Sequence, residues 1–328
     1  MGILKQSEIE LKASWMQIRD SINEIRLTDS KTDGLLTNFL NLPHNLDPQR
    51  ICIIWPSEYG WSLVHKWVFP LLSEFKRNFA VKFKPLPKYC NVIYFEVEIN
   101  GKTYPFAIDT YDKVEINKKC ASKAKTYFKM QYATEGYSFN NIVPGGFVPA
   151  NSSIYLHLNK VRKIRNSQSF IYEVYGRFGS RFAKTIRRQA TEKLAAQNKF
   201  SYEGGIGRVS YKKSLYEIAA SKVCVDLPGH GPLCFRLIDY LAVGSCIVAY
   251  PHKAKLPVPL TPGKEIVYCQ EDLSDLNDIC EYYINHDRER EEIARASRAY
   301  FDTHLRRPVL ASYYINTIIN SVRAKTAA

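Results

Sequence analysis

The chain has 328 residues, of which 45% are apolar, 24% are charged and 13% are aromatic, and its formal net charge is +14. This composition excludes a low-complexity chain, and the length exceeds what one hydrophobic core usually organises, so we expect two domains. The charge calls for an anionic partner, and a nucleoside diphosphate, a nucleic acid, an anionic glycan or a membrane surface would each satisfy it.

The first thirty residues predict neither a secretory segment nor a spanning helix, because charges interrupt every apolar run. Eight scattered cysteines without CxxC or zinc-ligand spacing indicate free thiols, so we expect a cytoplasmic protein. Residues 7–26 instead predict an amphipathic helix whose apolar face packs on the first domain. Its apolar positions are Ile9, Leu11, Trp15, Ile18, Ile22 and Ile25.

The rest of the first half predicts short strands. Residues 51–55 form an apolar run of strand length, and a helix interrupted by Pro70 follows it. The runs NVIYFEVEI and KTYPFAID flank Asn100 and Gly101, a dipeptide that favours a two-residue hairpin turn. TYFKMQY predicts another strand, VPGGFV predicts a loop, and residues 151–169 predict a polar, basic connector.

The second half alternates apolar strands with amphipathic helices. Strands are expected at residues 170–175, 222–227 and 245–250, with a further short strand in FSYEGG. This alternation predicts a parallel sheet covered by helices on both faces, in which ligands bind at the carboxyl ends of the strands. The chain looks helical from Asp272 onward, and Pro308 marks a break before a final helix.

The segment from Ser210 to Tyr250 carries the main signal for a ligand. A buried strand ends at Pro228, and the turn formed by Gly229, His230 and Gly231 lets the backbone approach a ligand. The helix that follows begins with free N–H groups, which attract phosphate.

This segment resembles the C-terminal donor domain of exostosin-like glycosyltransferases and, more loosely, of other GT-B enzymes. The shared order is a strand, a Pro-Gly turn, a helix with an arginine and an acid, and a Gly-Cys strand. The residues in that order are Pro228, Gly229, Arg236, Asp239, Gly244 and the strand 246–249. Where retaining GT-B families often place a glutamate before the helix acid, this chain has the Gly-His-Gly turn, so His230 could contact the donor instead.

The resemblance implies an α/β, GT-B-like fold with two Rossmann-like domains that face each other across a cleft. Residues 1–160 would form the acceptor-side domain, residues 161–307 would bind a nucleotide-sugar, and residues 308–328 would return to the N-terminal domain. The implied activity is the transfer of a sugar from that nucleotide-sugar to an acceptor. Arg236 and Asp239 would contact the donor.

Basic residues gather at turns of the second half. Nine Lys or Arg side chains and one acid occur between Lys160 and Arg188. Arg177 and Arg181 follow one predicted strand and Arg208 follows the next, where a pyrophosphate would lie. An ordinary solvated helix face is expected for the other cations of the following helix: Lys184, Arg187 and Arg188.

The first half supplies the candidates for acid–base chemistry. Glu58 follows the first strand, and its aromatic neighbours predict a raised pKa, whereas His65 lies on an apolar helix face and is expected to be packed. Asp109 ends a strand and resembles the acidic strand end of exostosin-like enzymes, in which Lys129 would be the lysine of the next strand. No Asp-x-Asp triplet occurs, so we expect a metal-free mechanism and no cofactor beyond the donor.

Three functions stay open at this point. The first is a transferase that acts on a glycan, a lipid-linked or a small acceptor. The second is a transferase that modifies a nucleic-acid base, which would use the +14 charge, and the third is a non-catalytic nucleic-acid-binding protein.

Overall fold

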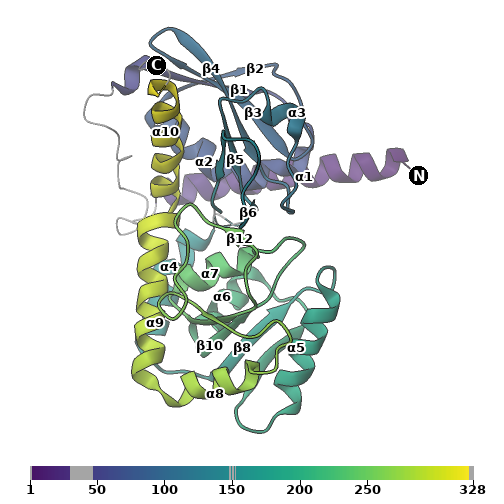
Figure 1. Cartoon of the computed structure of the whole chain (residues 1–328), viewed down its shortest axis with the longest axis vertical. Helices are drawn as coiled ribbons and strands as arrows, with labels where there is room; N and C mark the ends of the chain where they lie inside the picture. Colours follow the sequence, from purple (N-terminus) through teal and green to yellow (C-terminus); the bar gives the residue numbers. More distant parts are fainter. Residues whose placement is uncertain (1, 30–46, 148, 150, 152, 325–328) are drawn as a thin grey trace. The chain divides into compact units, whose positions relative to one another are not determined.

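The computed structural model describes residues 2–29, 47–147, 149, 151 and 153–324. The chain divides into two compact units. The first consists of Met1–Ser152, Lys255–Pro257 and Leu305–Ala328, and the second of Ser153–Ala254 and Val258–His304. Each unit contains its own β-sheet covered by helices (Figure 1).

The sheet of the first unit has six strands in the order β2-β1-β3-β4-β5-β7. All of them are parallel except β3, which is antiparallel to both β1 and β4. Asn100 and Gly101, with φ angles of 50° and 76°, join β3 to β4, which confirms the predicted hairpin. The bounds are β1 (Ile51–Pro56), β2 (Ala80–Lys84), β3 (Val92–Ile99), β4 (Lys102–Asp109), β5 (Thr126–Lys129), β7 (Ile142–Pro144) and the two-residue β6 (Tyr132–Ala133).

Helices α2 and α10 pack together over this sheet and bury its core, in which Trp55, Phe75 and Tyr314 are almost inaccessible to solvent. Helix α2 runs through Pro70 without a break, and α10 has Pro308 in its first turn, where the missing N–H costs no hydrogen bond. The bounds are α1 (Gly2–Asp29), η1 (Pro48–Arg50), η2 (Ser62–Val64), α2 (His65–Asn78), α3 (Lys118–Ala121) and α10 (Arg307–Arg323).

A buried ion-pair network joins three helices of the first unit. Arg307 of α10 is fully buried, and its Nε donates a hydrogen bond to Glu74 of α2 at 2.6 Å. The same guanidinium pairs with Glu24 of α1. Arg77 of α2 donates to Glu24 at 3.1 Å and to Glu74 at 3.0 Å. Removing one partner from such a buried network leaves an uncompensated charge, so the network fixes α1 and α10 on α2.

Helix α1 confirms the predicted helix but packs through the face opposite to the one we expected. Its buried side chains include Ala13, Asp20 and Leu27, whereas the apolar positions from Leu11 to Ile25 are 44–65% exposed. The prediction was wrong because ion pairs of Glu24, rather than the apolar stripe, orient the helix. In the described part of the chain no helix combines the length and the apolarity that crossing a bilayer requires.

The sheet of the second unit has five strands, all parallel, in the order β13-β11-β10-β8-β9. Helices α5 and α8 bury one face of it, while α6 and α7 contact the strands from the other (Figure 1). The predicted α/β fold class is confirmed, because each unit has a sheet with parallel strands that helices cover. The bounds are α4 (Ile154–Asn166), β8 (Tyr172–Phe178), α5 (Lys184–Ala196), β9 (Tyr202–Ile206), α6 (Tyr211–Ala219), β10 (Ser221–Asp226), α7 (Phe235–Val243), β11 (Cys246–Ala249), β12 (Ala254–Lys255), β13 (Val267–Tyr268), α8 (Leu276–Asn285), α9 (Asp287–Tyr300) and the π-helical turn η3 (Phe301–Leu305).

The predicted connector at residues 151–169 is wrong, because α4 occupies most of it. Two of its basic residues are buried and bind backbone carbonyls of the second unit. Arg162 donates to the Ala242 carbonyl at 2.8 Å, and Arg165 donates to the Gly244 carbonyl at 3.0 Å. The basic character that suggested a solvated linker therefore serves internal hydrogen bonding.

Candidate functional site

The order of strands in the second unit reverses at β8. Strand β9 lies on one side of β8, and β10, the next strand in the chain, lies on the other. Open parallel sheets bind ligands outside the carboxyl ends of their strands at such a reversal. Residues 179–183 after β8 and residues 227–234 after β10 form the loops at this position.

Two contacts hold these loops together. The ring of His230 stacks on Phe182, with the ring centroids 4.7 Å apart and the planes within 3°. Arg187 of α5 donates to the carbonyl of Gly179 at 2.7 Å and to that of Pro228 at 3.0 Å. We expected a solvated Arg187, which is wrong: the side chain is buried because it joins both loops, and this burial lowers its pKa.

Arg236, in the first turn of α7, connects the loop after β10 to the sheet. Its guanidinium donates to the Leu227 carbonyl at 2.9 Å, lies 4.6 Å from the ring centroid of Phe178 and pairs with Asp226 at 3.4 Å. Asp226 is the last residue of β10 and is 1% exposed. Within the described residues neither Asp226 Oδ1 nor Arg236 Nε has a hydrogen-bond partner, which is unusual for buried polar atoms.

A row of polar side chains runs from Asp226 across the ends of three neighbouring strands. Asp226 ends β10, His252 follows β11 and Tyr268 ends β13. His252 Nε2 lies 3.4 Å from Asp226 Oδ2, and the Tyr268 hydroxyl lies 3.1 Å from His252 Nδ1. Burial raises the pKa of Tyr268 to about 12. None of the three side chains was predicted from the sequence, although Asp226 ends one correctly predicted strand and His252 follows another.

Asp239 lies on α7, three residues after Arg236. Its carboxylate accepts a hydrogen bond from the Tyr211 hydroxyl at 2.8 Å. Burial raises the pKa of Asp239 to about 7, although the bond from Tyr211 and the charge of Arg236 act in the opposite direction. Perturbed carboxyl pKa values cluster at functional sites, although ion pairs and hydrogen bonds within the fold also produce them.

The three other predicted phosphate ligands differ in their ion pairs and in their exposure to solvent. Arg177 lies within β8, which continues beyond the predicted strand end, and it pairs with Glu203 at 2.5 Å and with Glu217 at 3.1 Å. Its charge is therefore already balanced by two carboxylates. Arg181 and Arg208 are exposed, in the loops after β8 and β9.

A hollow of about 370 Å³ lies beside the loop after β8, at the start of α5. Three cations contribute to its wall, so it suits an anion. Its lining residues are Gly179, Ser180, Lys184, Thr185, Arg187, Arg188 and Ile206.

Contacts within the chain do not require a glycine at position 229, the first residue of the Gly-His-Gly turn. A Cβ at Gly229 would meet Cys234 Sγ at 3.7 Å, an ordinary contact, and neither Gly229 nor Gly231 has a positive φ. Close approach of a ligand is the remaining physical reason for a small residue there.

In the first unit Asp109 ends β4 and is paired in register with Lys129 at the end of β5. The carboxylate lies 3.2 Å from Lys129 Nζ and accepts hydrogen bonds from the Tyr127 hydroxyl at 2.6 Å and from the Tyr111 N–H at 2.7 Å. Burial raises its pKa, with the charge of Lys129 acting against it. A cavity of about 200 Å³ is lined by Asp109 and by Cys90, Asn91, Val92, Tyr111, Glu115, Ile116 and Asn117.

Glu58 lies after β1 at the same edge of the sheet, but its surroundings differ from the prediction. Its side chain is 70% exposed and pairs with Lys88, whose hydrogen bond and charge lower the pKa of Glu58. The expected raised pKa is therefore wrong, because Trp55 turns into the core instead of covering the carboxylate. His65 is packed, with its ring centroid 4.8 Å from that of Phe69, and burial lowers its pKa to about 4.

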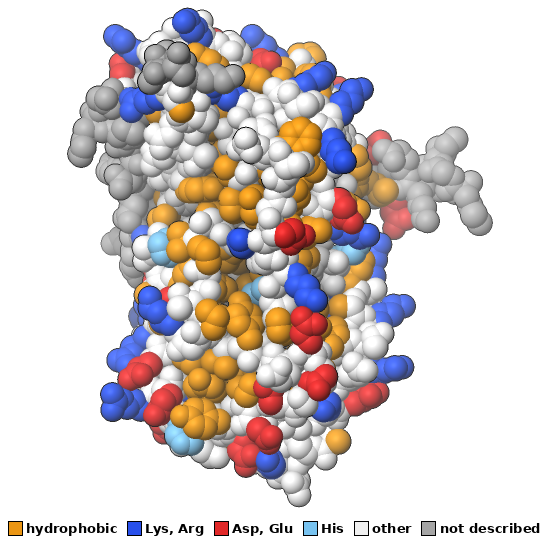
Figure 2. Space-filling model, viewed as in Figure 1, with side chains coloured by type: hydrophobic (Ala, Val, Ile, Leu, Met, Phe, Trp, Pro, Cys, Tyr) orange, Lys and Arg blue, Asp and Glu red, His pale blue; other side chains and the backbone are white. Residues whose placement is uncertain are grey.

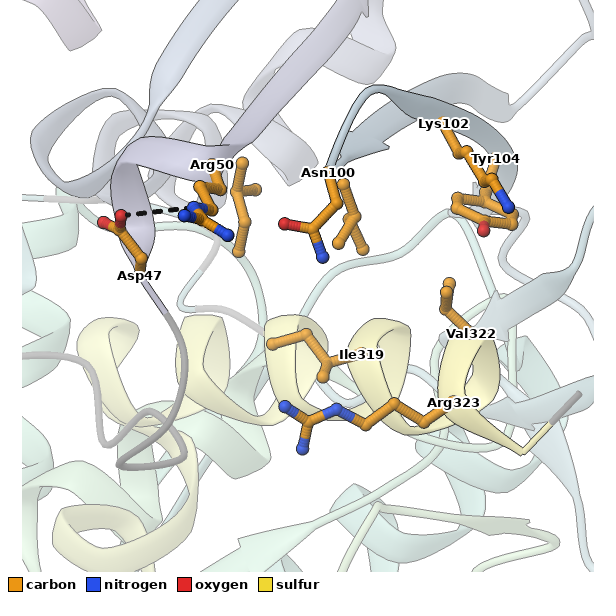
Figure 3. A pocket seen from close by; sticks show the side chains of 10 residues that line it. Asp47, Arg50, Asn100, Lys102, Tyr104, Ile319, Val322 and Arg323 are labelled. Atoms are coloured by element: carbon orange, nitrogen blue, oxygen red, sulfur yellow. Dashed lines mark ion pairs between the residues drawn. The ribbon is translucent and has the colours of Figure 1, made fainter. Parts of the chain in front are cut away.

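A hollow of about 490 Å³ lies at the opposite edge of the first sheet (Figure 3). Arg50, Asn100 and Tyr104 border it from the strand side, and Ile319 and Arg323 border it from α10. The carboxyl ends of β1, β4 and β5 are at the other edge, so this hollow is not where the α/β rule places a substrate.

The family match falls mainly on the unit that holds the reversal of strand order. Residues 174–312 match the family described as glycosyl transferase-like. These residues form a glycosyl transferase-like domain. The matched range, 139 of the 328 residues, contains Asp226, Arg236, Asp239, His252 and Tyr268.

Two solved structures are similar to the chain at low sequence identity. A glycosyltransferase from Rickettsia africae ESF-5 is 10% identical, with a TM-score of 0.42, over 63% of this chain and 68% of that one. TarM is 13% identical, with a TM-score of 0.35, over 63% of this chain. The chain spans 47% of the length of TarM. No curated protein matches.

Proposed function

We propose that the protein transfers a sugar from a nucleotide-sugar to an acceptor and that the donor binds at the carboxyl edge of the second sheet. The observation that carries this proposal is the family match of residues 174–312, which falls on the unit whose strand order reverses between two joined loops. The exostosin-like character and the cytoplasmic location stay predictions.

The diphosphate of the donor would lie at the starts of α5 and α7. Both helices begin without a side-chain cap, at Ala183 and Cys234, and the positive end of a helix dipole attracts an anion. Lys184, Arg188 and Arg181 are exposed and add positive charge around the start of α5. Helix N-termini and cations would balance the departing nucleoside diphosphate without a metal.

The sugar or ribose hydroxyls would meet Asp226 and Arg236. Each has a buried polar atom without a hydrogen-bond partner among the described residues, although Asp226 Oδ1 is in an ion pair with Arg236, and a hydrogen bond from a ligand would remove that cost. His252 and Tyr268 would hold the Asp226 carboxylate in place through the row of strand-end side chains.

For the acceptor base we favour Asp109 over Glu58. A general base works best with a pKa near the operating pH, and burial raises that of Asp109 whereas Lys88 lowers that of Glu58. Asp109 also borders a cavity that an acceptor hydroxyl could enter.

A nucleic-acid acceptor is less favoured. Basic and acidic side chains are interspersed on the face shown in Figure 2 and do not gather into one stripe along which a phosphate backbone would run.

Calorimetric titration with uridine, guanosine, cytidine and adenosine diphosphates, and with their sugars, tests the donor site. We expect one nucleotide to bind, and Lys184→Gln to weaken it roughly tenfold through loss of a charge-assisted contact. Lys193→Gln, a matched change near the other end of α5, should bind normally. Binding of no nucleotide, or equal affinity in both variants, would contradict the proposed site.

Chelation tests the metal-free mechanism. Among the described residues no three His, Cys, Asp or Glu side chains gather in a metal-binding arrangement. We expect turnover to persist in EDTA once the donor is known. Turnover lost in EDTA and restored by manganese would overturn this part of the proposal.

A further inference from the structure

Helix α1 carries an exposed apolar stripe. Leu11, Trp15, Ile18, Ile22 and Ile25 follow one another at alternating four- and three-residue spacing and are 44–65% exposed. They are five of the ten exposed large hydrophobic side chains among the described residues, so half of these side chains lie on one helix. A concentration of this kind marks an interaction surface.

The first unit holds α1 so that this stripe stays outward. The opposite side of the helix buries Ala13, Asp20, Asn23 and Leu27. Glu24 is paired with Arg307 and Arg77 of the same unit. The helix therefore cannot rotate its apolar side inward without breaking buried ion pairs.

Basic side chains border the stripe on one side. Lys12, Arg19 and Arg26 recur every seven residues and are exposed, although Arg19 is paired with Asp20 at 2.7 Å. Lys66 of α2 adjoins this row: burial, and then the charge of Lys12, lowers its pKa to about 8. Glu8 and Glu10 end the stripe toward the N terminus.

The borders of the stripe do not suit a second copy of the chain. Ser14 and Ser21 form its other border, so a parallel copy would place cations against hydroxyls, and an antiparallel copy would place cations against cations. The stripe also covers about 21 Å of helix, or two heptads, whereas coiled coils usually need three or more.

An anionic lipid surface matches both the apolar stripe and its basic border. Leu and Ile side chains enter the boundary of the acyl chains, a tryptophan favours the interface, and bordering Lys and Arg reach the headgroups. The first unit, which carries α1, has 24 Lys and Arg against 15 Asp and Glu residues, so it is attracted to such a surface as a whole. We propose that the protein docks on anionic membranes through the exposed stripe of α1.

Vesicle flotation with the full chain tests this docking. We expect binding to phosphatidylcholine vesicles that contain phosphatidylglycerol, and weak binding to phosphatidylcholine alone. Ile18→Asp with Ile25→Asp should lower the affinity about tenfold or more, because two inserted side chains are lost. Lys12→Gln and Arg26→Gln should each lower it about fivefold.

Matched variants elsewhere control for general effects. Ile171→Asp changes an isoleucine that is 73% exposed in the second unit, and Lys163→Gln removes an exposed cation of α4. Both should bind vesicles normally. Because the charge variants leave the apolar stripe intact, they test the proposal even if the aspartate variants fold poorly. Nucleoside diphosphate binding should be unaffected in every variant.

Three outcomes would overturn the proposal. The first is equal binding to anionic and neutral vesicles, and the second is unchanged binding by the stripe variants. The third is a parent protein that sediments as a dimer, ignores vesicles and becomes monomeric on Ile18→Asp, because a second copy would then cover the stripe.

Discussion

The rings of Phe182 and His230 lie face to face, 4.7 Å apart, and join the loops after β8 and β10. An aromatic pair of this kind contributes about 0.5–1.5 kcal/mol beyond its buried area. Phe182→Ala should therefore loosen both loops and weaken nucleoside diphosphate binding roughly three- to tenfold, as measured by calorimetry.

Tyr282 provides the control for this change. Its ring stacks on His286 with the centroids 3.8 Å apart, on and just after α8, whose residues do not enter the loops at the strand reversal. Tyr282→Ala should leave nucleotide binding unchanged. Equal losses in both variants would mean that the Phe182 stack has no special role at the donor site.

Arg187 and Arg188 are neighbours, but their substitution should affect stability to very different extents. Arg187→Ala removes two hydrogen bonds from a buried guanidinium to loop carbonyls, so the free energy of unfolding should fall by about 2–4 kcal/mol. Arg188 is exposed and pairs with Glu192 at 3.8 Å, so Arg188→Ala should change it by less than about 0.5 kcal/mol. Urea denaturation of both variants measures the difference, and similar values would refute the loop-joining role.

Asp226 and Arg236 should show strong thermodynamic coupling. Breaking a buried ion pair from one side costs about 3–5 kcal/mol, because the other charge remains buried. We expect Asp226→Asn and Arg236→Met each to destabilise the protein strongly, and the double variant to lose clearly less than the sum. Additive losses in a double-mutant cycle would show that the two groups act independently.

The stability contributed by Asp239 should depend on pH. Its pKa is raised from 3.8 when unfolded to about 7 in the fold, so its contribution is complete below the lower value and is lost as pH rises through the upper one. Asp239→Asn removes this dependence. The free energy of unfolding of the variant minus that of the parent should therefore increase between about pH 5 and about pH 8. A difference that stays constant over this range would contradict the raised pKa.

Substitutions of Asp109 and of Glu58 should have different effects on kcat in a turnover assay. If Asp109 is the base, Asp109→Asn should lower kcat by about 10²–10⁴, and Glu58→Gln should leave it nearly unchanged. Asp109→Asn also leaves the buried Lys129 without its ion-pair partner. The variant that combines Asp109→Asn with Lys129→Met removes that unpaired charge and serves as the folded control. Turnover restored in that double variant would show that the loss came from instability rather than from a missing base.

The strands and helices of the second unit were largely predictable, because fully buried parallel strands leave continuous apolar runs such as KVCVDL and SCIVAY. The hairpin at Asn100 was predictable because the local turn chemistry decides it. In these places neighbouring residues alone fix the structure.

The errors arose where distant residues decide the outcome. The apolar stripe of α1 predicted a packed face, but Arg307 reaches Glu24 from the other end of the chain and sets the opposite orientation. Arg187 looked like a solvated cation because the carbonyl of Pro228, which it binds, is 41 residues away. His252 and Tyr268 carried no motif, since only the sheet order brings them beside Asp226.

The Arg307 network also affects the order in which the two units can fold during translation. The first unit needs Glu24, Glu74 and Arg307 together, so its ion-pair network cannot close until nearly the whole chain has been translated. All strands of the second unit lie between residues 172 and 268. Because domains tend to fold as they emerge from the ribosome, the second unit should acquire its fold before the first is complete. A chain truncated before Arg307 would then contain all of the second unit and an N-terminal unit that still lacks its last helix.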